Sequence, residues 1–73
     1  MIKKFDYSKL LGKIKEKGYT LKTFAESINI SASTLSLKLS NKANFTQKEM
    51  FKACEVLGFE SKNIGVYFFT LKV

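Results

Sequence analysis

The fold of this 73-residue chain is decided by residues 21–40, which read LKTFAESINISASTLSLKLS. The first half has the i, i+3, i+4, i+7 apolar spacing of one helix face, at Leu21, Phe24, Ala25 and Ile28. The second half opens with Ser31, a good helix cap, and carries two apolar residues four apart, Leu35 and Leu39. Asn29, between the halves, tolerates the left-handed conformation that ends a helix. The segment predicts two short helices joined by a turn of about three residues, with little room for a side chain larger than Ala25 where they cross.

Two more helices flank this pair. Residues 6–17 carry one apolar helix face, made by Tyr7, Leu10, Leu11 and Ile14. Thr46 and Glu49 form a T-x-x-E capping box, and the helix that follows buries Met50, Ala53, Cys54 and Leu57. The chain is therefore expected to be all-α: a compact bundle of four to five short helices containing a helix-turn-helix, in a single domain over residues 1–73. The tail, 61–73, allows one helical turn and then a possible C-terminal β-strand, because residues 66–73 are rich in β-branched and aromatic side chains.

Composition excludes several classes of function. The chain has 13 lysines, six acidic residues, no histidine and one cysteine, with a net charge of +7. Without histidine it lacks the usual zinc sites and the Ser–His and Cys–His nucleophile pairs, so we expect no metal, no cofactor and no enzyme activity. Its start does not resemble a signal peptide, and no run of 18 apolar residues occurs, which favours a cytoplasmic protein.

The positive charge favours a polyanionic partner and is unevenly distributed. Residues 1–45 hold nine lysines and three acidic residues, whereas residues 46–73 hold four and three. The basic half is thus the half that contains the helix pair, which favours nucleic acid as the partner.

The run NISASTLS, residues 29–36, and the small polar loop that follows it resemble the helix-turn-helix of phage Cro and CI-like (XRE-type) regulators. The resemblance extends over residues 6–58, with the motif at 21–40. It implies a sequence-specific, double-stranded DNA-binding repressor of the Cro type, acting in a phage or prophage switch in the bacterial cytoplasm. Its third helix would lie in the major groove.

The resemblance also implies the residues that contact DNA. Base edges would be met by Ala32, Ser33, Ser36 and Leu37, flanked by Ser31, Thr34 and Ser40. Phosphates would be met by Thr20, Lys22, Asn41, Lys42 and Asn44. Lys38 is expected to pack its stem and offer its charge to a phosphate.

A domain this small, reading DNA mainly through serines, would gain specificity as a homodimer on a palindromic operator. The suspected dimer interface is the tail, through Val66, Tyr67, Phe68, Phe69, Leu71 and Val73.

Two alternatives remain open. One is a small helical protein-interaction module, an antirepressor or adaptor, that uses the aromatic tail as its contact surface. The other is an amphipathic protein of membrane surfaces, suggested by the lysine-rich first helix.

Overall fold

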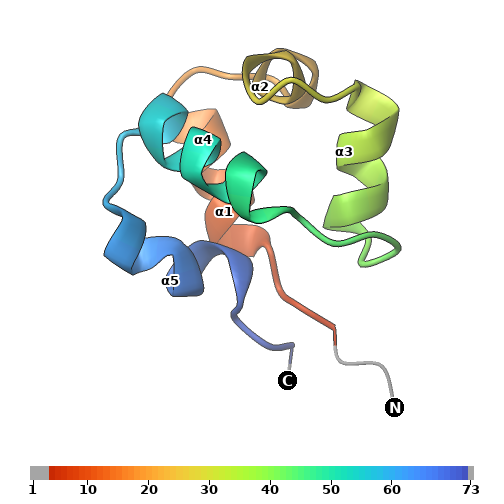
Figure 1. The fold of residues 1–73 in the computed structure, drawn as a ribbon, viewed down its shortest axis with the longest axis vertical. Helices are drawn as coiled ribbons and strands as arrows, with labels where there is room; N and C mark the ends of the chain where they lie inside the picture. The colour runs from red at the N-terminus through yellow and green to blue at the C-terminus, as the bar shows by residue number, and fades with distance from the viewer. Residues whose placement is uncertain (1–3, 73) are drawn as a thin grey trace.

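The computed structural model describes residues 4–72, and the elements in that range are all helical (Figure 1). Five α-helices follow one another, with a single 3₁₀ turn, η1, before the last: α1 (Ser8–Glu16), α2 (Leu21–Ser27), α3 (Ala32–Leu39), α4 (Gln47–Leu57), η1 (Ser61–Asn63) and α5 (Ile64–Phe68). α2 packs against α3, and α5 packs against α1 and α4. The all-α bundle and the helix-turn-helix expected from the sequence are confirmed.

The helices begin at the predicted caps. Thr20, Ser31 and Thr46 precede α2, α3 and α4, and each side-chain oxygen accepts a hydrogen bond at 3.1 Å from the backbone N–H three residues later. The turn between α2 and α3 places Asn29 at φ 65°, as its position suggested. Gly58 ends α4 at φ 74°, a conformation that a residue with a Cβ adopts only with strain.

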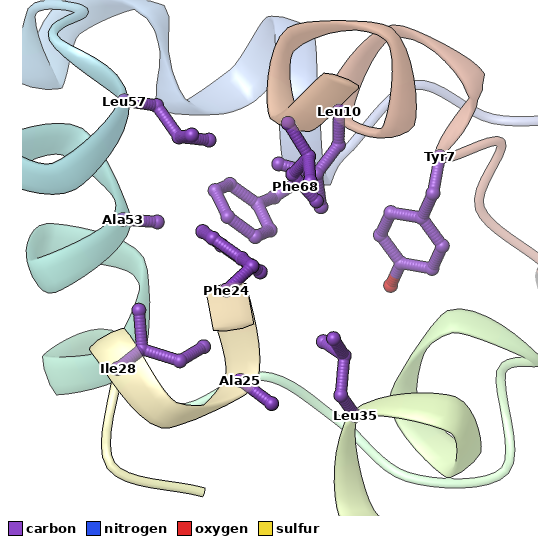
Figure 2. Packing of buried hydrophobic residues seen from close by; sticks show 10 residues of the cluster. Tyr7, Leu10, Phe24, Ala25, Ile28, Leu35, Ala53, Leu57 and Phe68 are labelled. Carbon is purple, nitrogen blue, oxygen red and sulfur yellow. The ribbon is translucent and has the colours of Figure 1, made fainter. Parts of the chain in front are cut away.

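The core is built by side chains that every α-helix sends inward (Figure 2). Phe24 and Ala25 of α2 lie at its centre and are fully buried, facing Ala53 and Leu57 of α4 and Leu35 of α3. Because protein interiors are close-packed, the surroundings of Ala25 leave no space for a side chain longer than its methyl group. The prediction that α2 and α3 cross closely at Ala25 fits this burial.

The tail is helical where the sequence left a strand possible. Val66 lies inside α5, and no strand longer than one bridge occurs within residues 4–72. A helix puts Ile64 and Phe68 on one face, and Phe68 becomes a core residue whose ring meets that of Phe45 edge-on at 4.9 Å. An alternating strand would have turned its neighbours inward instead.

Asn41 joins the N-terminal segment to the loop after α3. Its Oδ1 accepts from the Phe5 N–H at 2.8 Å, and its Nδ2 donates to the Phe5 carbonyl at 3.1 Å. On the other edge of the segment, the Asp6 N–H and the Lys4 carbonyl bond to Thr70 and Lys72. The Asn41 amide therefore pairs with the Phe5 backbone as a neighbouring strand would, and residues 4–6 are held beside residues 70–72 (Figure 1).

We expect Ala25→Leu to lower the free energy of unfolding by about 1–3 kcal/mol, because the extra carbons overpack the junction of α2 and α3. Urea denaturation followed by circular dichroism measures it. The matched control is Ala32→Leu, an exposed position of α3, which should change stability by no more than about 0.5 kcal/mol. Equal effects at both positions would contradict the close packing at Ala25.

Asn41→Gly removes the amide while keeping the positive φ of 65° accessible. Losing two hydrogen bonds should cost about 1–2 kcal/mol and should speed hydrogen exchange of the Phe5 amide, read by NMR. Asn44→Gly, an exposed position in the same loop, should leave that exchange rate unchanged. Unaltered exchange in Asn41→Gly would show that the amide does not hold the segment.

Candidate protein-interaction surfaces

The outward face of α3 gathers the residues that were predicted to read bases. Ala32, Ser33, Ser36 and Leu37 are all exposed, and Leu37 keeps 48% of its surface in solvent. The flanking hydroxyl groups serve the helix itself: Ser31 donates to Thr34 at 2.8 Å, and Ser40 donates to the Leu37 carbonyl at 3.1 Å. The face is small and polar, with one leucine in it.

Lys38 is not available to a phosphate, contrary to the sequence-based expectation. It is 6% exposed, and its Nζ donates to the Glu49 carboxylate of α4. The ammonium also lies 5.8 Å from the centre of the Phe45 ring. Its position on α3 faces α4 rather than solvent, so the charge is neutralised within the protein.

Of the other residues predicted to contact phosphates, two have side chains that are hydrogen-bonded within the protein and three are exposed. The Asn41 amide is occupied by Phe5, and the Thr20 hydroxyl caps α2. Lys22, Lys42 and Asn44 are exposed, on α2 and in the loop after α3.

Part of the aromatic tail is packed inside the protein, so those residues of the predicted interface are not free to meet a partner. Phe68 is in the core, and Tyr67 stacks on Phe59 with ring centres 4.3 Å apart. Phe69 is half exposed but meets the Phe5 ring edge-on at 5.6 Å. Val66 and Leu71 are also half exposed, whereas Val73 lies outside the described residues.

An open groove of about 570 Å³ lies between the turn after α2 and the outer face of α4. Its apolar lining is provided by Ile28, Ile30 and the half-exposed Phe51. Charges of both signs border it, at Lys48, Lys52, Glu49 and Glu55.

A second groove, of about 330 Å³, lies between α1 and the start of α2. It is lined by Leu11, Ile14, Lys15, Tyr19, Thr20 and Leu21. The sequence pattern placed Leu11 and Leu21 on buried faces, but 39% and 46% of their surfaces are exposed. Leu11 lies about 100° around α1 from the buried Leu10, and Leu21 starts α2 one turn before the core residues. Both leucines therefore border the groove instead of filling the core.

The described residues are informative about a metal site, a reactive thiol and a membrane span. No cluster of His, Cys, Asp or Glu there can hold a metal ion. Cys54 is buried, and burial raises the pKa of its thiol, which keeps it protonated and unreactive. In residues 4–72 no helix is long and apolar enough to cross a membrane.

Glu49 is held by an ion pair and by hydrogen bonds within the protein. Burial acts to raise the pKa of its carboxyl, but hydrogen bonds from the Lys38 ammonium and the Thr46 backbone N–H outweigh burial and lower the pKa below 4.5. The ionised form is thus favoured in the folded protein.

Comparison with protein families assigns the chain to a family whose function is unknown. A family model described as "Protein of unknown function (DUF739)" matches residues 3–71, so the chain belongs to that family. A search of curated proteins found no match.

A solved structure gives a particular relative. The chain is similar to the modulator of repression (MOR) of the temperate bacteriophage TP901-1 from Lactococcus lactis. The two share 45% identity, with 89% of this chain and 88% of the other covered, and a TM-score of 0.76.

These findings correct the earlier identification. The assignment as a Cro or CI-like DNA-binding repressor is wrong, because the chain matches a modulator of repression and the DUF739 family. The palindromic DNA operator and the homodimer inferred from that assignment are corrected with it. A helix-turn-helix is present, but a fold does not by itself define a function.

The lowered pKa of Glu49 predicts a pH dependence of stability. Because the pKa is lower in the folded state, the stabilisation is complete above the unfolded value of about 4.5 and is lost as pH falls through the folded value. Glu49→Gln should lower the free energy of unfolding at pH 7 by about 1–3 kcal/mol. The difference in the free energy of unfolding between Glu49→Gln and the wild type should become smaller below pH 4. Urea titrations from pH 3 to 7 measure both, and a difference that does not change with pH would contradict the ion pair.

Proposed function

We propose that this chain is a small helical protein-interaction module that modulates repression by binding a repressor protein, as an antirepressor or adaptor. The observation that carries the proposal is the 45% identity with the phage modulator of repression over 89% of the chain. At that level of identity and coverage, a shared mode of action is a reasonable inference. We propose a binding role without enzyme activity, exerted in the cytoplasm of a bacterial host.

The surface supports a protein partner. Seven large apolar side chains among residues 4–72 are half exposed: Leu11, Leu21, Leu37, Phe51, Val66, Phe69 and Leu71. Single exposed apolar residues are ordinary, but residues gathered at a groove are typical of interaction sites. Three of the seven line the two grooves described above: Leu11, Leu21 and Phe51.

The charge adds a preference about the partner. A net charge of +7 speeds encounter with acidic surfaces and disfavours basic ones. The one lysine of α3 is neutralised by Glu49, so the outer face of that helix carries no charged side chain of its own. We therefore expect the basic charge to act on an acidic region of a protein.

The test adds this chain to the repressor encoded in the same phage or prophage genome, bound to its operator DNA. We expect the chain to bind the repressor in isothermal titration calorimetry at 0.15 M salt and to change its electrophoretic mobility shift. The chain alone should leave the operator unshifted at the same concentration. A scrambled chain of equal composition and charge controls for electrostatic binding.

Two results would overturn the proposal. One is the absence of heat and of any altered shift when folded chain and repressor are mixed. The other is a specific shift of the operator by this chain alone.

A further inference from the structure

We propose that the groove between α1 and α2 binds an amphipathic helix of the repressor that carries acidic residues beside its apolar face. The inference rests on the proposed function and assigns it a site and a partner chemistry. It begins from a mismatch between sequence and structure: Leu11 and Leu21 follow core periodicity, yet they remain half exposed on opposite sides of one groove.

Most of the lining is apolar. Leu11 and Ile14 contribute one wall from α1, and Tyr19 and Leu21 contribute the other. The Tyr19 ring is fixed edge-on against the buried Phe24 at 6.4 Å, and the Tyr19 N–H bonds to the Ile14 carbonyl at 3.0 Å. The walls are thus held by the core, and the groove exists before any partner arrives.

The lining of the groove carries positive charge and no negative charge. Lys15 is its single charged lining residue, and no carboxylate lines it. Residues 8–22 contain five lysines and one acidic residue, Glu16, which pairs with Lys13 at 3.2 Å. Within residues 4–72, neither Lys15 nor Lys22 pairs with a carboxylate. Carboxylates on the partner could form ion pairs with these two lysines.

The chemistry fits a helix better than a small molecule. Small-molecule sites combine apolar walls with a few converging polar groups. Here Thr20 supplies the other polar side chain, and its hydroxyl is engaged with the Thr23 N–H as the cap of α2. An amphipathic helix needs only an apolar groove and a charged rim.

The larger groove beside α4 is a weaker candidate for the same ligand. It contains two carboxylates, Glu49 and Glu55, among its lining residues. Lys48 and Lys52 line it as well, so its charges are of both signs, whereas the only charged residue lining the groove between α1 and α2 is a lysine.

The first test uses a double variant that carries Leu11→Gln and Leu21→Gln. Its affinity for the repressor is measured by isothermal titration calorimetry. Glutamine is about as long as leucine and has a similar helix propensity, so the double variant should fold. Circular dichroism checks that it does. We expect affinity to fall at least tenfold. Leu37→Gln is the matched control, since Leu37 is exposed to the same degree on α3, and it should change affinity less than threefold.

The second test reverses one charge. Lys15→Glu should weaken binding at least tenfold, whereas Lys42→Glu, an exposed lysine in the loop after α3, gives the same change in net charge and should have a small effect. Raising the salt concentration should narrow the gap between the two variants, because surface charges are screened.

The outcomes separate the two proposals. If the wild-type chain binds the repressor but the groove variants bind as tightly as it does, the groove assignment is overturned and the proposed function stands. Greater loss from Leu37→Gln or Lys42→Glu than from the groove variants would also overturn the assignment. A wild-type chain that does not bind the repressor overturns both.

Discussion

The carboxylate of Glu49 holds together parts of the molecule that the chain separates. It accepts from the Thr46 N–H at the start of α4 and from the Lys38 ammonium of α3. Between these residues lies Phe45, whose ring meets Tyr7 and Phe68 edge-on. The Glu49 side chain thus joins the start of α4 to α3, and Phe45, next to Thr46 in the chain, belongs to the ring cluster that contacts α5. A domain of this size has few buried residues, so each such contact carries a large share of its stability.

The same contact removes from the outer face of α3 the one charge that this helix carries. Lys38 is the only charged residue of α3, and it is turned toward α4. What α3 presents to solvent is small, polar and uncharged apart from the apolar Leu37. The leucine-lined groove between α1 and α2, by contrast, has an exposed lysine, Lys15, in its lining. A helix-turn-helix packed in this way can serve protein binding, because function depends on the site rather than on the fold.

Local signals in the sequence predicted most of the fold. The caps at Thr20, Ser31 and Thr46, the turn at Asn29 and the end of α4 at Gly58 depend on neighbours within a few residues, and all were found. The apolar periodicity predicted wrongly where burial depends on residues distant in the sequence. It predicted that Leu11 and Leu21 are buried, and it allowed a strand in the tail where the structure has α5. The Asn41–Phe5 and Lys38–Glu49 contacts join residues that are 36 and 11 positions apart, which no local pattern reveals. The function was misassigned because the helix pair occurs in proteins of several functions.

The most direct measurement of the central claim is a map of the backbone amide NMR shifts of this chain as the repressor is added. If the protein is a repressor-binding module that uses the groove lined by Leu11 and Leu21, the largest changes should fall within residues 11–22. Amides of α3, including Leu37, should move little. Changes concentrated on α3, or shifts produced by operator DNA and not by the repressor, would contradict the account.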